Sequence, residues 1–272
     1  MIWSLTADAA QFAASAESWL LRDPVRNTVM LTVLRGLRSG QFAEDPLFGW
    51  ATGDDGTVVG AFCHTPPYPL TLGEVPPGAI APLVRDLVEA DRRLTAVRGP
   101  VSAVEAFATA WWRPESGRRA ERLYLLDTLR PAPAPGKPRI AGPGDVDQAA
   151  RWFREFEAEA HIERAVDVTP LVSARINREE LVWWEDEGRP VSLAGVSAPI
   201  SGMSRIGPVY TPLALRGRGY GSAVTHAVTR KALDDGATEV LLFTDLSNLT
   251  SNSIYQRLGY RPIADHATIH FA

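Results

Sequence analysis

A glycine-rich segment with two arginines has the residue types in this sequence that are best suited to binding a ligand. Residues 216–222 carry Arg216 and Arg218, and glycines alternate between and beyond them: Gly217, Gly219 and Gly221. Glycine permits positive φ and lets a ligand approach the backbone closely. Apolar residues at helical spacing follow at once, so free N–H groups at a helix start face the loop. The pattern predicts a site for phosphate oxygens.

Three other interpretations of this loop can be weighed from the sequence. A tight glycine turn with solvated arginines is the simplest. A Walker A loop requires a lysine after its second glycine, and this loop has none. A dinucleotide-binding turn is a closer rival, because Asp245 ends a later strand roughly 20 residues on. However, its glycines would be spaced differently, and Pro212 to Arg216 separate the strand from Gly217. We rank that interpretation second.

The residues around the loop resemble the GNAT family of N-acetyltransferases. Arg216-x-x-Gly219-x-Gly221 is similar to the pyrophosphate loop of that family, R/Q-x-x-G-x-G/A. The similarity extends to 209–212 before the loop and to Asn248, 252–255 and 258–260 after it. It covers the C-terminal half in detail and the N-terminal half in outline. The resemblance implies an acyl-CoA N-acyltransferase fold, which is an α/β (α+β) mixed sheet.

The resemblance also implies a binding site for acetyl-CoA as co-substrate. In the family, this ligand lies where two neighbouring parallel strands splay apart, here Met203–Tyr210 and Glu239–Thr244. Its amide arm pairs with the first strand, its pyrophosphate meets the glycine loop, and asparagines and a tyrosine follow. The implied binding residues are Val209, Tyr210, Thr211, Arg216, Gly217, Arg218, Gly219, Tyr220, Gly221, Ser222, Asn248, Asn252, Ser253 and Tyr255.

The implied reaction is direct attack of a neutral amine on the thioester carbonyl. A backbone N–H near Val209 or Tyr210 is the expected oxyanion partner. Tyr255 is the expected acid, because a phenol (pKa about 10) is protonated at neutral pH and a thiol has a pKa of about 8.5. The base stays open between water and a carboxylate from 153–167, a region that in the family borders the acceptor site. The candidates there are Glu155, Glu157, Glu159, His161 and Glu163.

The acceptor is an amine, and a small molecule and a peptide are equally compatible with these residues. Two other functions remain open. A non-catalytic module could bind acetyl-CoA as a signal, which turnover with an amine panel would test. A dinucleotide-dependent oxidoreductase would bind NAD and not CoA.

Composition and charge argue against several classes of protein. The chain has 272 residues and a formal net charge of −4, which argues against general binding to nucleic acid or membranes. Its one cysteine, Cys63, excludes an internal disulfide, and the five histidines show no metal-binding spacing. With no signal peptide or membrane span, we expect a cytoplasmic protein without metal, as a monomer or homodimer.

A proline-rich segment at 131–138 divides the chain, and similar patterns occur on both sides of it. Each half predicts two helices, a hairpin, and then alternating helices and strands. We therefore expect two tandem modules: a degenerate GNAT-like domain over 1–130, a linker over 131–138 and an acetyltransferase domain over 139–272. The first module has Pro76–Pro82 in place of the phosphate loop and Phe107 in place of the tyrosine.

Boundaries follow from caps and turns. In the first half we expect helices after Thr6 and from Asp23-Pro24, a hairpin over 47–64 and an irregular segment over 66–77. In the second half we expect helices after Asp145 and from Thr169-Pro170 and a hairpin over 181–196. A further helix is expected to end at Leu258, and capping of this helix is the alternative to ligand binding for Asn252.

Overall fold

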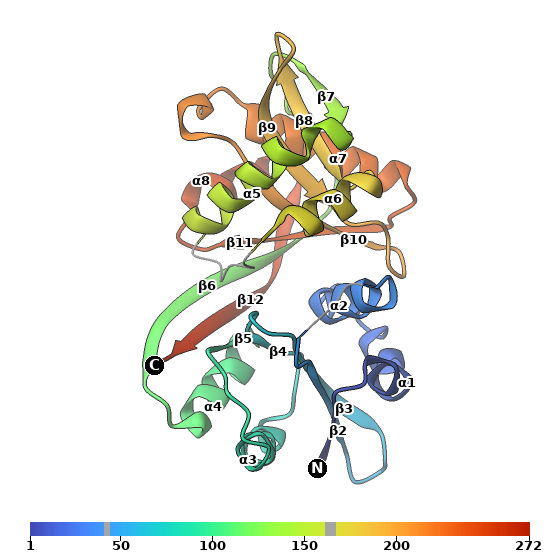
Figure 1. The fold of residues 1–272 in the computed structure, drawn as a ribbon, viewed down its shortest axis with the longest axis vertical. Coiled ribbons are helices and arrows are strands. Elements are labelled where there is room, and N and C mark those ends of the chain that lie inside the picture. The colour runs from blue at the N-terminus through green and yellow to red at the C-terminus, as the bar shows by residue number, and fades with distance from the viewer. Residues whose placement is uncertain (41–43, 161–166) are drawn as a thin grey trace. The chain divides into compact units, whose positions relative to one another are not determined.

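The computed structural model describes residues 1–40, 44–160 and 167–272, and the chain packs as two compact units (Figure 1). The first unit contains residues 1–122 and 264–272, and the second contains 123–263. The boundaries fall inside two long strands, β6 (Glu115–Leu126) and β12 (Tyr260–Phe271), so each strand has residues in both units. The module boundaries expected at 131–138 stay a prediction, because these units are defined by packing alone.

The first unit pairs its strands in a distinctive order. Strands β1, β2, β3 and β4 pair antiparallel in sequence, and β4 then pairs parallel with β5. The crossover between the two parallel strands is helix α3. The elements are β1 (Ile2–Thr6), α1 (Ala9–Leu20), α2 (Thr28–Arg38), β2 (Leu47–Thr52), β3 (Val58–His64), β4 (Leu70–Leu72), α3 (Ile80–Glu89), β5 (Ala96–Pro100) and α4 (Val101–Trp111).

The second unit repeats this order. Strands β7, β8, β9 and β10 pair antiparallel, and β10 then pairs parallel with β11 across helix α7. The same succession of antiparallel and parallel pairings in both units confirms the predicted duplication of the fold. The elements are β7 (Lys137–Ile140), α5 (Val146–Glu159), α6 (Thr169–Asn177), β8 (Leu181–Asp186), β9 (Arg189–Val196), β10 (Met203–Tyr210), α7 (Tyr220–Asp234), β11 (Glu239–Asp245) and α8 (Leu249–Arg257).

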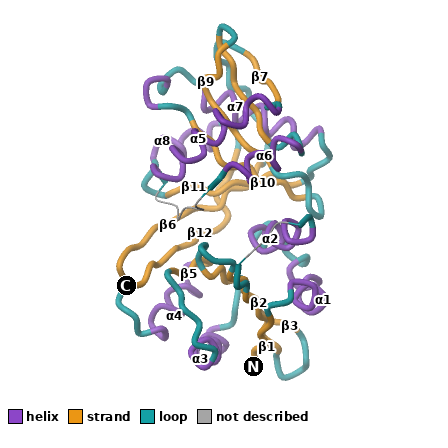
Figure 2. The backbone as a smooth tube through the Cα atoms, viewed as in Figure 1, coloured by secondary structure: helices purple, strands orange, loops and turns teal. Residues whose placement is uncertain are grey.

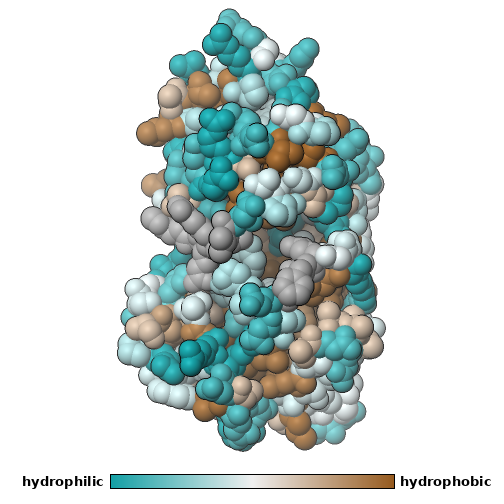
Figure 3. Space-filling view, in the orientation of Figure 1, coloured by the Kyte–Doolittle hydropathy of each residue, from teal (hydrophilic) through white to brown (hydrophobic). Residues whose placement is uncertain are grey.

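Helices cover both faces of the strands of the second unit (Figure 2). On one face, α7 and α8 pack Val224, Val228 and Tyr255 against the sheet. On the other, α5 and α6 pack a second apolar cluster that includes Trp152 and Trp183. The outer surface over α5 and α6 shows mainly hydrophilic residues (Figure 3), as expected for helices with one apolar side.

Several predicted boundaries differ from the structure, because tertiary pairing decides them. Thr6 ends strand β1 and Asp8 caps α1 instead, accepting a hydrogen bond from the Ala10 N–H. The Asp23 carboxylate accepts from the Arg26 N–H in a turn, and α2 starts later, at Thr28. Strand β4 lies within the segment expected to be irregular, where it is held between β3 and β5. Strand β7 takes the last two residues of the expected linker.

Candidate functional site

The two parallel strands of the second unit separate where the site was predicted. Their pairing runs from Met203 opposite Glu239 to Ile206 opposite Leu242. Both strands continue past this register, β10 to Tyr210 and β11 to its end at Asp245. Beyond this register the two strands do not pair with each other, and backbone groups without ladder partners need other partners. An extended ligand with amide groups can supply them, as an added strand would.

A β-bulge in β10 accompanies this separation. Ile206 lies opposite Val196 of β9, but Val209 lies opposite Ala194, so β10 has one extra residue between these pairs. Gly207 has φ +151° in this bulge and is followed by Pro208, which has no N–H. The bulge changes the twist of β10 just before the predicted oxyanion donors.

Tyr210 and Thr211 are fixed by neighbours on both sides. The Tyr210 hydroxyl donates to the Glu155 Oε2 atom at 2.9 Å and contacts Glu159 Oε1 at 3.4 Å. Burial, followed by the bond to Glu155, raises the pKa of Tyr210. The Ser192 hydroxyl donates to the Tyr210 carbonyl at 2.9 Å and lies 2.8 Å from the Thr211 hydroxyl. Two of the candidate carboxylates of α5 thus lie at the end of β10.

The glycine loop has the conformation that an anion site requires. Gly217 and Gly219 have φ +78° and +85°, and Gly219 is the N-cap residue of α7. No acidic side chain lies in the first turn of α7, and no side chain caps it. Within the described chain, the backbone N–H groups of residues 217–222 have no protein acceptor. A Cβ built on Gly217 would meet nothing within 4 Å. The loop fits a pyrophosphate.

The side chains of the loop have protein partners in this state. Arg216 Nη2 lies 2.5 Å from Glu159 Oε2, and its Nε donates to the Thr211 carbonyl at 2.8 Å. Both side chains of the ion pair are more than two-fifths exposed, so water screens it. Tyr220 is buried and donates to Asp186 at 2.5 Å, which fixes the start of α7 to β8.

Helix α8 places the predicted asparagines differently from expectation. Asn248 is the N-cap of α8 and accepts from the Ser251 N–H at 3.0 Å, which contradicts the alternative in which Asn252 caps the helix. Asn252 lies inside the first turn, and its amide donates to the Asp245 and Asn248 carbonyls at 2.8 Å. It joins the end of β11 to α8.

Ser253 and Tyr124 form hydrogen bonds with residues of α8. Ser253 is exposed and accepts from Arg257 within α8 at 2.6 Å. Tyr124 of β6 donates its hydroxyl to Asn252 at 2.9 Å and accepts from Gln256 at 3.1 Å. Sequence reasoning did not single out Tyr124. Its only signal was an aromatic residue in a predicted strand, and its partners are more than a hundred residues away.

Tyr255 lies in the core formed by α7, α8 and the sheet. Its side chain is 7% exposed, and its ring lies 6.4 Å from that of Tyr124 and 6.3 Å from that of Tyr260. Burial raises the pKa of Tyr255 to about 12, and a hydrogen bond with Ser251 opposes this rise. The phenol is therefore a proton donor throughout the neutral range.

A protein-family model matches the part of the chain that contains these elements. Residues 146–260 match the acetyltransferase (GNAT) family. Those residues form a GNAT acetyltransferase domain. The family uses acetyl-CoA as co-substrate and acts on amine acceptors. In the described part of the chain, no helix is long and apolar enough to cross a membrane, and no group of three or more potential ligands could hold a metal ion.

Solved GNAT structures match nearly the whole chain. An acetyltransferase from Colwellia psychrerythraea superimposes with a TM-score of 0.64 at 13% identity, covering all of both chains. A GCN5-related N-acetyltransferase from Sphaerobacter thermophilus gives 0.62 at 16% identity and covers 98% of this chain and 94% of that one. A tandem GNAT protein from the clavulanic acid biosynthesis pathway gives 0.59 at 14% identity and covers 98% of each. No curated protein matches the sequence at a significant level.

The first unit therefore shares the GNAT fold, and its parallel strands pair over a shorter register than those of the second. Leu70 lies opposite Val97, and Thr71 lies opposite Arg98. A Cβ on the next residue, Gly99, would lie 2.7 Å from the Leu72 carbonyl oxygen. At this point β4 and β5 thus remain close together one residue beyond their register.

The acidic region before α6 is only partly described. Glu155 and Glu159 lie at Tyr210, as reported above, while Glu157 points inward and is 8% exposed. His161 and Glu163 lie outside the described residues. The structure thus brings two of the five candidate groups to the end of β10.

Proposed function

We propose that this protein transfers an acetyl group from acetyl-CoA to an amine, with one site in the second unit. The observation that carries the proposal is the run of backbone N–H groups at residues 217–222, which have no protein acceptor in the described chain. These groups lie at the N-terminus of α7, beside Arg216 and Arg218. Together they provide the electrostatic complement of a pyrophosphate.

Each group of the site would have its own role in acetyl transfer. Acetyl-CoA supplies an acetyl thioester. A backbone N–H at Val209 or Tyr210 would donate to the carbonyl oxygen as negative charge develops there. The amine nitrogen forms the new C–N bond, the C–S bond breaks, and Tyr255 donates its hydroxyl proton toward the departing sulfur. The amine releases one proton to water or to an α5 carboxylate. The products are an N-acetyl amide and CoA.

The acceptor side of the site favours an amine over a neutral or anionic group. Glu155 and Glu159 lie within hydrogen-bonding reach of Tyr210, at the end of the strand that carries the proposed oxyanion donor. A small-molecule amine and a peptide amine remain equally compatible with these carboxylates. The first unit would hold no acetyl-CoA, because Pro76–Pro82 lacks the features of the phosphate loop and Gly99 lies close to the Leu72 carbonyl across its parallel strands.

A non-catalytic acetyl-CoA-binding module is the second candidate. The observation in its favour is the position of Tyr255, which is 7% exposed and packed between two other tyrosine rings. A phenol in this position can serve as a core residue alone. Release of free CoA thiol in the presence of an amine panel distinguishes an enzyme from a binding module.

Binding of acetyl-CoA tests the proposed site through Gly221→Asp. Gly221 has no positive φ, and a Cβ there would touch only the Thr211 hydroxyl at 3.3 Å, so the variant should fold. An aspartate in the first turn of α7 would repel a pyrophosphate by several kcal/mol. We expect the Kd measured by isothermal titration to rise at least about a hundredfold.

Gly144→Asp is the matched control for this experiment. Gly144 lies in the same unit, before α5, and a Cβ there would meet nothing within 4 Å. The control should bind acetyl-CoA as the wild type does. Equal affinity in the wild type and Gly221→Asp would remove the loop from the site. NAD binding without CoA binding would instead support the dinucleotide interpretation.

A further inference from the structure

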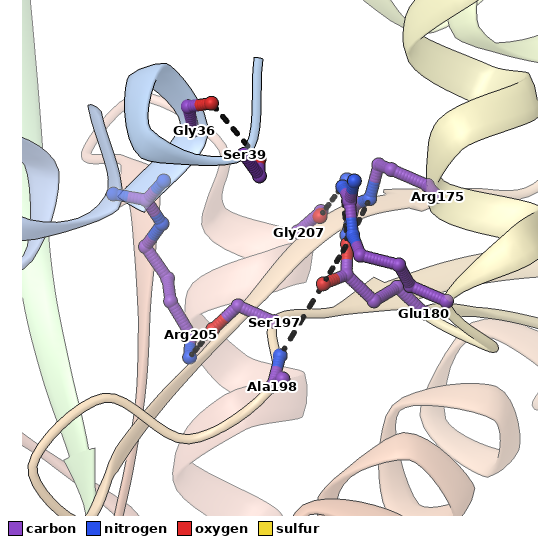
Figure 4. Close-up of polar contacts among 9 residues, drawn as sticks. Gly36, Ser39, Arg175, Glu180, Ser197, Ala198, Arg205 and Gly207 are labelled. Atoms are coloured by element: carbon purple, nitrogen blue, oxygen red, sulfur yellow. Dashed lines mark hydrogen bonds and ion pairs between the residues drawn. The ribbon is translucent and has the colours of Figure 1, made fainter. Parts of the chain in front are cut away.

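We infer that Arg175 is a positioning residue for the acetyl-transfer reaction, acting through the carbonyl group of Gly207. Arg175 lies in the last turn of α6, and its Nη1 donates to the Gly207 oxygen at 2.9 Å (Figure 4). This inference rests on the proposed function, because it concerns the strand that would supply the oxyanion donor.

The bulge creates the need for this contact. An extra residue in one strand disrupts the ladder locally and leaves backbone groups unpaired. The extra residue here falls between Ile206 and Val209, where Pro208 has no N–H to offer. A partly buried carbonyl without a partner is unfavourable, and a charged donor offsets that cost well. Arg175 supplies this donor from a helix on one face of the sheet.

The geometry around the guanidinium suits arginine in particular. The guanidinium lies close to Gly195, the β9 residue opposite the bulge. A Cβ on Gly195 would overlap Nη2 of Arg175 and lie 2.7 Å from the Gly207 oxygen. On another side, the guanidinium carbon lies 5.8 Å from the centre of the Phe153 ring. A residue without a side chain is thus needed at Gly195 for the contact between Arg175 and the bulge.

A buried carboxylate balances the charge of Arg175. Glu180 is 4% exposed, and its Oε2 lies 3.5 Å from Arg175 Nε. Arg178 donates to both oxygens of Glu180 at 3.1 Å, and the Ala198 N–H contacts the same carboxylate (Figure 4). Glu180 therefore orients Arg175, while Arg178 contacts the carboxylate and not the bulge. This difference supplies a matched control.

The consequence for the reaction concerns the direction of one N–H group. The Gly207 carbonyl lies in the peptide unit immediately before the one that carries the Val209 N–H, and fixing it limits the rotation of the peptides that follow. A donor misplaced by about 1 Å can cost roughly a hundredfold in rate, and loss of an oxyanion donor costs about a hundredfold to a thousandfold. Arg175 would thus affect kcat without touching acetyl-CoA or the amine.

The test compares Arg175→Met, Arg175→Lys and Gly195→Ala with Arg178→Met as control. Each protein is titrated with CoA, and thiol release from acetyl-CoA is followed with a panel of primary amines. For Arg175→Met and Gly195→Ala we expect kcat to fall about tenfold to a hundredfold while the Kd for CoA stays within about twofold. Lysine, which can still donate to the carbonyl, should recover part of the loss. Arg178→Met should match the wild type.

The outcomes separate this inference from the proposed function. Absence of turnover in the wild type with every amine would remove the proposed function. A wild-type enzyme whose kcat is unchanged in folded Arg175→Met would overturn the role of Arg175 alone. Equal losses in kcat and CoA affinity would also overturn it, since they indicate general disruption of the unit. If Arg175→Met fails to fold, Gly195→Ala and Arg175→Lys decide by the same criteria.

Discussion

At the residue scale, the burial of Tyr255 limits how it can act as an acid. Burial raises its pKa to about 12, whereas a free thiol has a pKa of about 8.5. Complete proton transfer to a free thiolate would therefore be unfavourable by about 5 kcal/mol. We expect Tyr255 to donate a strong hydrogen bond to the sulfur while the C–S bond breaks. The phenol is then fully protonated again when CoA leaves.

Replacement of Tyr255 by phenylalanine tests this role. We expect kcat to fall about a hundredfold, within the range of general acid catalysis, while the KM for acetyl-CoA changes little. Tyr260→Phe is the matched control, because Tyr260 is also a buried tyrosine of the same core, and its hydroxyl contacts Thr229 at 2.6 Å. Steady-state kinetics of both variants would contradict the role if they lost activity equally.

Some roles of individual residues could be predicted from the sequence and others could not. The glycine loop was predicted because its residues are contiguous and their types alone indicate an anion site. The sequence did not show which asparagine, Asn248 or Asn252, caps α8. Either asparagine can cap a helix, and the first residue of the helix decides between them. The contact from Arg175 to Gly207 spans 32 residues and depends on a β-bulge that no local sequence pattern predicts.

At the element scale, tertiary pairing overrides local pattern most clearly in β4. Its three residues, Leu70–Leu72, lie in a proline-rich segment that predicted no strand. They form one because β3 pairs with them on one side and β5 on the other. The 47–64 hairpin was predicted correctly, since its two strands are close in sequence and joined by a glycine turn.

The end of strand β3 should make stability depend on pH. Burial, with Arg92 nearby, lowers the pKa of His64 to about 4, and Asp45 opposes this effect. His64 Nδ1 accepts a hydrogen bond from Arg92 Nε at 2.9 Å, which requires an unprotonated nitrogen. The unfolded chain binds the proton near pH 6.5, so stability is complete above that pH and falls toward pH 4. The loss amounts to about 3 kcal/mol.

Urea unfolding between pH 7.5 and 4.5 measures this effect. Asparagine at position 64 can accept from Arg92 without titrating, so His64→Asn should lose less stability over this range than the wild type. His266, whose pKa burial also lowers to about 4, should keep part of the slope in the variant. Identical slopes in the two proteins would show that His64 does not contribute.

At the scale of the whole molecule, one fold occurs twice with two different outcomes at its parallel strands. The order of antiparallel and parallel pairings is the same in both units. This repetition was predictable, because each half shows the same succession of helices, hairpin and proline-rich or glycine-rich connection. The lengths of β6 and β12 were not predictable in the same way, since each strand has residues in both units.

The difference between the two parallel pairs predicts one acetyl-CoA site in each chain. In the first unit, Gly99 lies close to the Leu72 carbonyl across the parallel strands, and residues 76–82 lack arginine and alternating glycines. In the second, the register ends at Ile206 and the glycine loop follows. Isothermal titration with acetyl-CoA should therefore give a stoichiometry of about one per chain, and Gly221→Asp should remove that site entirely. A stoichiometry of two in the wild type, with one site remaining in the variant, would show that the first unit binds the ligand as well. Because the variant carries its charge in the second unit alone, the site that remained would belong to the first.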